Sequence, residues 1–215
     1  FKNKIIYIPI TDMPGGEDPY LRENYQRNSI SRGLKNAKDD DIILVSDLDE
    51  IPNPNSLKNF NQKMRYATFK QKHFYYKFNL QSKNYPFWNG TRACVKKYLK
   101  SPQWLRNLKF KKRPFWRIDK IRLNNIIEDG GWHFCNLKTP ENLLYKYKNL
   151  CETNDPIHFK ESIDPKYLKL EEVKKRIVSG EDIIGRKDNF IKVNLDNSFP
   201  EYLTKNKFNY KDWII

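Results

Sequence analysis

Two aspartates, Asp47 and Asp49, have the spacing expected of two ligands to one divalent cation. They follow the branched apolar run Ile42–Val45 and precede Glu50 and Pro52. The run predicts a strand buried on both faces, as in a mainly parallel sheet, and the proline ends sheet pairing. Ligands of open α/β sheets gather outside the carboxyl ends of the strands, where carboxylates can hold a cation and its diphosphate. The stretch predicts a metal-dependent site for a nucleotide-activated substrate; the alternative is that the acids only form a turn or a helix cap.

The residues before this stretch predict a βαβ unit. Lys4–Ile10 is rich in isoleucine and predicts a buried strand, a loop with paired glycines follows, and Tyr20–Ala37 has the apolar spacing of a helix. Arg27 on this helix either pairs with Glu23, four residues earlier, or supports the acidic stretch or a phosphate. The unit predicts parallel strands with a right-handed crossover. Its loop has neither glycine pattern of dinucleotide or P-loop sites, which argues against both chemistries.

The rest of the chain predicts one continuous domain, residues 1–215, without repeats or linkers. Its expected elements are short helices, a strand with one wet face and two longer helices: Asn55–Met64, Ala67–Leu80, Ser101–Phe110, Thr139 to about Cys151, and Glu171–Ser179. Asn53 or Asn55 is expected to cap the first of these helices, and Gly180 to end the last. The alternation of strands and helices favours an α/β class.

The charge balance is strongly basic. Lysines and arginines number 41 against 26 acidic residues, a net charge of +15. Such a field attracts polyanions, so nucleic acid, an anionic membrane or a phosphorylated substrate are all compatible partners. The densest basic run is Lys109–Arg113, for which we favour a solvated or acceptor-facing loop over a nucleic-acid site. No apolar run reaches the roughly 18–20 residues of a membrane span.

The three cysteines, Cys94, Cys135 and Cys151, are odd in number and lack a Cys-x-x-Cys spacing. They predict neither a zinc site nor a disulfide framework. Buried thiols in a reducing compartment are the simplest interpretation. The chain is therefore expected in a cytoplasm of bacterial or viral type, or in the Golgi lumen if an N-terminal anchor precedes Phe1.

An ordered set of short motifs resembles glycosyltransferase family 17. The matching pieces follow the family's order over nearly the whole chain: Lys4–Ile8, Arg22–Glu23 with Gln26–Asn28, Ser46–Pro52, Trp88 with Gly90–Arg92, Gly131–Phe134, Thr139–Glu141 and Pro200–Leu203. The resemblance implies a GT-A-like α/β fold with a mostly parallel mixed sheet flanked by helices. It implies a UDP-sugar donor, N-acetylglucosamine as the sugar, a glycan acceptor, a divalent cation and inversion at the anomeric carbon. Family members carry a further βα segment before the position of Phe1, so the chain is expected to be a fragment or a shortened homologue.

The resemblance also assigns roles to single residues. Asp49 is the expected metal ligand, Asp47 a contact to the ribose or to a metal-bound water, and His133 a further metal ligand or diphosphate contact; the alternative for His133 is simple packing beside Trp132. Further donor contacts are expected from Arg27, Trp132 and Arg92. Mn²⁺ or Mg²⁺ suits a site rich in carboxylates, and an imidazole ligand favours Mn²⁺.

Inversion also requires a group that takes the proton of the attacking hydroxyl. Glu128 and Asp129 lie just before the Gly-Gly-Trp-His motif and are positional candidates, while Glu50 and Glu141 stay open as alternatives.

Two other classes compete with a transferase. A haloacid-dehalogenase-type phosphatase also has Asp-x-Asp after a buried strand, but it needs Thr or Val where this chain has Ile51. A non-catalytic basic module would bind glycan or nucleic acid by stacking on its aromatics, yet it would leave the acidic stretch unexplained.

Overall fold

The computed structural model describes residues 2–16, 18–61, 63–109, 116, 125–149 and 163–215. Cys151 and most of the basic run 109–113 lie outside the described residues, so the interpretations given for them stay predictions. In the part of the chain that is described, no helix has both the length and the apolar character needed to cross a lipid bilayer.

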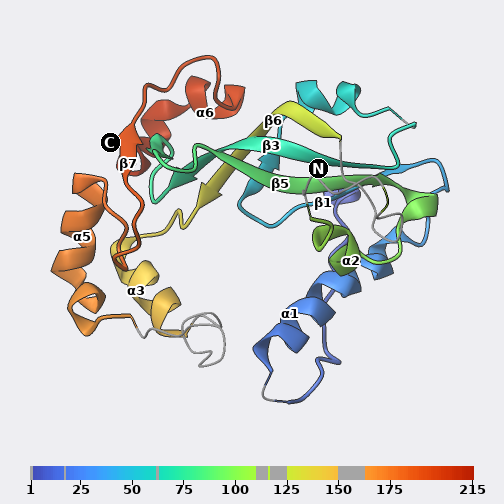
Figure 1. Cartoon of the computed structure of the whole chain (residues 1–215), viewed down its shortest axis with the longest axis horizontal. Helices are drawn as coiled ribbons and strands as arrows, with labels where there is room; N and C mark the ends of the chain where they lie inside the picture. Colours follow the sequence, from blue (N-terminus) through green and yellow to red (C-terminus); the bar gives the residue numbers. More distant parts are fainter. Residues whose placement is uncertain (1, 17, 62, 110–115, 117–124, 150–162) are drawn as a thin grey trace.

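A seven-stranded mixed sheet forms the centre of the described structure (Figure 1). Its main path runs in the order β1 (Ile42–Val45), β5 (Phe87–Val95), β3 (Tyr66–Tyr75), β4 (Leu80–Ser82) and β7 (Phe190–Lys192). Off this path, β6 (Ile126–Cys135) pairs both with β3 and with the short β2 (Glu50–Pro52). The α/β class is confirmed.

The expectation of a mostly parallel sheet is wrong. Within the described residues β3 and β6 run parallel, and the other strand pairs are antiparallel. The connections explain this, because neighbours such as β3, β4 and β5 are joined by a few residues, whereas a parallel pair needs a long crossover. Strand β1 is also not buried on both faces: Ile43 and Val45 are buried, but Ile42 is 40% and Leu44 36% exposed.

The expected first strand of the βαβ unit is also absent. Lys2–Lys4 forms a 3-10 turn, η1, and residues 5–10 have no regular structure, with Ile5 and Ile6 both 68% exposed. An isoleucine-rich run forms a strand only where a sheet edge accepts its hydrogen bonds. Among the described residues β1 pairs with β5 alone, and residues 5–10 pair with no strand.

The helices agree better with the sequence patterns. Helix α1 (Pro19–Asn28) begins at the N-cap Asp18, whose side chain accepts from the Tyr20 amide, and continues as the 3-10 segment η2 (Ser29–Leu34). Asn53 caps η3, and Gly180 ends α5 in a left-handed conformation, as predicted. The remaining helical segments are η3 (Pro54–Asn59), η4 (Lys96–Tyr98), α2 (Pro102–Arg106), α3 (Pro140–Asn149), η5 (Pro165–Leu168), α5 (Leu170–Ser179), α6 (Glu201–Lys205) and η6 (Lys207–Trp213).

Separate hydrophobic clusters attach these helices to the sheet. Leu105 of α2 packs on Ile43 and Val45 of β1, and so brings α2 beside the acidic stretch. On the other side of the molecule, α3 and α5 pack on the end of β3 around Leu143 and Ile177 (Figure 1). Each fully buried side chain of this size stabilises the fold by about 1.5–3 kcal/mol.

Candidate functional site

The parallel pair β3–β6 determines which side chains face the site. Its register places His73 beside His133, Phe74 beside Phe134 and Tyr75 beside Cys135. Because side chains alternate along a strand, the histidines share one face and the phenylalanines the other. We call these the polar face (His73, His133, Cys135) and the apolar face (Phe74, Phe134). Strand β2 pairs with β6 and brings the acidic loop, Ser46–Asp49, to the same region.

The close approach of β2 to β6 requires a glycine. Gly131 has φ +123°, and a Cβ there would lie 2.1 Å from the carbonyl oxygen of Ile51. Only glycine adopts this conformation without strain and leaves room for the neighbouring backbone. The Gly-Trp-His motif therefore contains one residue whose role is to let the strand that carries His133 reach the acidic loop.

A buried ion pair anchors this loop. The Glu50 side chain is 1% exposed; its two oxygens accept from the Arg106 guanidinium at 2.8 and 2.9 Å, and one also accepts from Trp88 Nε1 at 3.0 Å. Burial lowers the pKa of Arg106, but its bonds to Glu50 and Asp47 outweigh that effect and raise the pKa above its ordinary value. The Glu50 charge is thus compensated by a two-pronged pair, the geometry that makes burial tolerable.

Asp47 is held by two arginines. One carboxylate oxygen accepts from Arg106 Nη2 at 2.6 Å, and the other from Arg27 Nη2 at 3.2 Å. Arg27 also pairs with Glu23 at 2.9 Å and donates to Gln103, so both contacts considered for it from the sequence are present. A hollow of about 310 Å³ opens here, lined by Glu23, Gln26, Arg27, Ile30, Ser46, Asp47 and Leu48.

Asp49 has a different environment. Its side chain is 37% exposed, and its Oδ2 lies 3.3 Å from His133 Nε2. Burial raises the pKa of Asp49, but the His133 ring outweighs it, so the pKa lies below its ordinary value. Asp49 is therefore ionised at neutral pH. Among the described residues its carboxylate contacts one imidazole, that of His133, whereas Asp47 pairs with two arginines.

The polar face continues from His133 to a second imidazole. The rings of His73 and His133 stack with centroids 4.8 Å apart and planes 2° apart, and Trp88 lies against both. Burial, and then the neighbouring His133, lowers the pKa of His73 to about 4. Burial, and then the negative charge of Asp49, raises the pKa of the Cys135 thiol to about 12. At neutral pH the face therefore has a neutral imidazole at His73 and a thiol at Cys135.

The sequence of this chain, including the residues of the site, matches the model of a known protein family. The model described as glycosyltransferase family 17 matches residues 1–189, which is most of the chain. The chain belongs to glycosyltransferase family 17. The matched range includes the acidic loop, α1 and the whole of β6, so the family resemblance carried by the motifs is confirmed.

Two curated relatives of this family 17 chain have the same name. The beta-1,4-mannosyl-glycoprotein 4-beta-N-acetylglucosaminyltransferases of Mus musculus and Homo sapiens are each 23% identical to it over 175 residues. The match covers 67% of this chain but 31% of each relative, so the chain spans about a third of their length. No solved structure matches the chain significantly.

Neither of the other two predicted donor contacts of this family 17 chain, Trp132 and Arg92, makes a hydrogen bond to the acidic loop among the described residues. Trp132 points to the opposite side of β6 from His133, and its Nε1 donates to the Ser198 carbonyl at 2.9 Å. Arg92 donates to Thr68 and to the carbonyls of Asn89 and Gly90, and its contacts brace β5. Burial, and then Arg106, lowers the pKa of Arg92 to about 10.

The two base candidates lie at the far end of β6. Glu128 is exposed and pairs with Lys70 at 3.0 Å, while the Asp129 carboxylate accepts from Asn53 at 3.1 Å. Asp129 precedes His133 by four residues, and it lies in an irregular part of β6, where the pairing with β3 shifts between Ile127 and Gly131. It lines a separate cavity of about 720 Å³ together with Trp132, residues 51–55 and residues 197–202 and 204.

Several residues of the site were missed or underrated by sequence reasoning. Arg106 and His73 were not singled out, and Glu50 was considered only as a base. For His73 the sequence contained a weak indication, because it lies in a predicted strand and its side chain must therefore lie beside a residue of the paired strand. Arg106 had none, because its partners lie far away in the sequence.

Proposed function

We propose that the chain is the catalytic part of a transferase that moves a sugar, N-acetylglucosamine, from a UDP-sugar to a glycan hydroxyl, with inversion and with a divalent cation. The observation that carries the proposal is Asp49: an ionised, partly exposed carboxylate in the loop between β1 and β2, steadied by His133. It follows Asp47 by two residues, and Asp47 lines a hollow together with Arg27. The family supports the reaction class, and the name that the two relatives share supports the sugar. An acidic loop after a strand of a mixed sheet also agrees with a GT-A-like arrangement.

The two aspartates of the acidic loop differ in how well they suit a divalent cation. Asp49 has exposed carboxylate oxygen in a loop, which is the donor type that Mn²⁺ and Mg²⁺ accept. Asp47 is neutralised by Arg27 and Arg106, so we assign it an indirect role through a metal-bound water or the ribose. The cation supplies charge stabilisation to the departing diphosphate.

The arginines suit the same diphosphate. Arg27 lines the hollow beside Asp47, and a planar guanidinium binds phosphate oxygens in a two-pronged manner. Arg106 is anchored by Glu50, which keeps it in place when Arg27 exchanges Asp47 for a phosphate. We assign Arg27 the direct contact and Arg106 the positioning of Asp47; Arg92 and Trp132 stay donor-contact predictions that lack a contact to this loop.

The acceptor hydroxyl must lose its proton as it attacks. Of the two carboxylates proposed for this step, Asp129 lines a cavity large enough for a sugar, whereas Glu128 faces solvent beside Lys70. We therefore favour Asp129, with the acceptor entering between Trp132 and α6.

Calorimetry of UDP with and without Mn²⁺ tests the proposal. We expect binding that depends on Mn²⁺ and that is lost in Asp49→Asn, because the amide keeps the shape and removes the charge. Glu128→Gln, an exposed carboxylate outside the loop, serves as the matched control and should bind as the wild type does. Binding of UDP that is indifferent to Mn²⁺ and to Asp49 would contradict the proposal. A steep salt dependence with RNA would instead favour a nucleic-acid module.

A further inference from the structure

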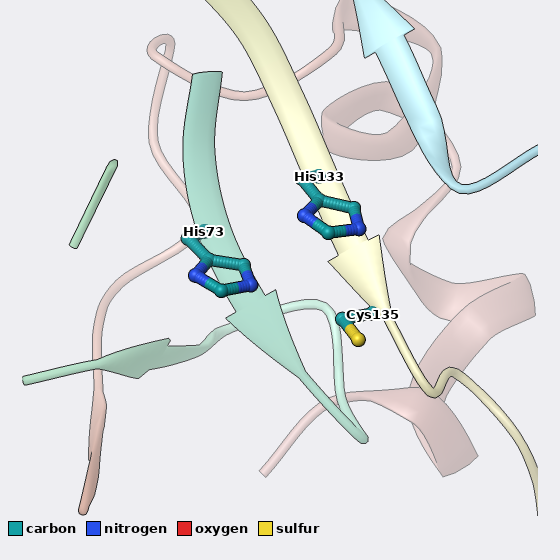
Figure 2. Close-up of side chains that lie close together, drawn as sticks. All are labelled: His73, His133 and Cys135. Carbon is teal, nitrogen blue, oxygen red and sulfur yellow. The ribbon is translucent and has the colours of Figure 1, made fainter. Parts of the chain in front are cut away.

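The polar face gathers three metal-binding side chains from two strands. Strands β3 and β6 run parallel with His73 beside His133, and Cys135 follows His133 by two positions, so all three project from the same face. Each offers one ligand atom, and these atoms lie within 4.8 Å of one another. Figure 2 shows the two imidazoles side by side with the Cys135 sulfur close to both.

Nitrogen atoms in this cluster are buried without a partner. His73 is 4% and His133 7% exposed, and among the described residues His73 Nε2 and His133 Nδ1 have no hydrogen-bond partner. A buried polar atom left unpaired costs about 1–3 kcal/mol. The other nitrogen of each ring is engaged, His73 Nδ1 with the Tyr85 carbonyl at 3.1 Å and His133 Nε2 with Asp49. The Tyr85 contact puts the proton on Nδ1 of His73, which leaves a lone pair on the unpaired Nε2.

We propose that His73, His133 and Cys135 bind one divalent transition-metal ion of the zinc class. Imidazole and thiolate are the ligands that Zn²⁺ prefers, whereas Mg²⁺ and Mn²⁺ prefer carboxylate and water. Two imidazoles and one thiolate form a three-ligand set that leaves a fourth position open. At Zn–N distances of about 2.0–2.1 Å and Zn–S of about 2.3 Å, tetrahedral ligand atoms lie about 3.3–3.6 Å apart. The cluster therefore closes by roughly 1 Å when the ion binds.

The surroundings support the same assignment. Metal-bound histidines characteristically have a carboxylate or a backbone carbonyl on their other ring nitrogen. Here Tyr85 supplies a carbonyl to His73, and Asp49 supplies a carboxylate to His133. This site is distinct from the site proposed on the acidic loop for the donor's Mn²⁺ or Mg²⁺. His133 would bind the zinc-class ion, and Asp49 would bind the Mn²⁺ or Mg²⁺. An ion bound here would also connect β3 to β6 and fix the orientation of the His133 ring that contacts Asp49. The proposed metal site does not depend on the transferase activity.

The experiment uses the purified chain, stripped with a chelator and titrated with Zn²⁺ against a chromogenic chelator. We expect one tightly bound equivalent. With Co²⁺ in its place, the absorption spectrum should show a thiolate-to-metal charge-transfer band. Because the cobalt spectrum is recorded on the wild type, it does not depend on any variant folding. A cobalt spectrum without the thiolate band would overturn the proposal.

Two variants and a matched control complete the test. Cys135→Ser and His73→Gln should each weaken Zn²⁺ binding more than about 100-fold, beyond the usual cost of losing an outer-sphere partner, and Cys135→Ser should lose the cobalt band. Cys94→Ser, a buried thiol on β5 away from the histidines, should bind as the wild type does. Thermal unfolding confirms that each variant is folded. Wild-type affinity in folded Cys135→Ser would also overturn the assignment.

The result is separable from the donor proposal. Mn²⁺-dependent UDP binding should survive Cys135→Ser and disappear in Asp49→Asn, while the cobalt band should survive in Asp49→Asn. Loss of one signal without the other therefore identifies which of the two proposals has failed.

Discussion

The two faces of the β3–β6 pair use the same backbone register for opposite purposes. On the apolar face, Phe74 and Phe134 are 1% and 5% exposed, stack at 5.4 Å and lie in one cluster with Phe199. On the polar face, His73 and His133 stack at 4.8 Å but keep ring nitrogens unpaired. The apolar face is complete by itself, whereas on the polar face His73 Nε2 and His133 Nδ1 have no hydrogen-bond partner among the described residues. The fold therefore holds its candidate site in place by packing a closed apolar core directly behind it.

The largest effect should come from the apolar face. Phe134→Ala removes a buried ring and leaves a cavity between β6 and α6, which should lower the free energy of unfolding by about 3–5 kcal/mol. Urea denaturation measures this loss. Donor binding per folded molecule should persist, because no group of the acidic loop is changed. A loss below 1 kcal/mol would show that the apolar face is not the main support of the site.

An intermediate effect should come from the ion pair beside the polar face. Glu50→Gln keeps the shape of a side chain that is 1% exposed and still accepts from Trp88, but it weakens the partner of Arg106. We expect a loss of about 1–3 kcal/mol in the free energy of unfolding, since Arg106 retains Asp47. Denaturation at pH 7 with the Arg106→Lys variant as a comparison tests this, because lysine keeps the charge and loses the two-pronged geometry. If Glu50→Gln unfolds like the wild type, the pair does not anchor the loop.

The smallest effect on stability should come from the end of β6 that belongs to neither face. Glu128→Gln breaks an exposed pair with Lys70 and should change the free energy of unfolding by less than about 0.5–1 kcal/mol.

Glu128→Gln should also retain transfer activity, whereas Asp129→Asn should lower kcat about 10²–10⁴-fold if Asp129 takes the acceptor proton. Steady-state kinetics of the two variants decides between them: a loss confined to Glu128→Gln would reverse the assignment.

Two helix ends were predicted from the sequence for a physical reason. Asn53 and Gly180 act on backbone groups within a few residues of themselves, so their effect on helix ends needs no knowledge of the rest of the chain. The acidic loop after β1 follows from the same local logic.

By itself the sequence determined the cap at Asn53 and the helix end at Gly180, together with the α/β class, the family and the acidic loop with its two aspartates. It did not determine every helix end, because the helix predicted over Tyr20–Ala37 ends at Asn28 and continues as the 3-10 segment η2. Only the tertiary structure decided that β1 pairs antiparallel with β5, that Arg106 covers Glu50, and that His73 lies beside His133. These contacts join residues far apart in the chain. They depend on which strand edges pair and in which register, and neither the pairing nor the register can be predicted from a local pattern of side chains.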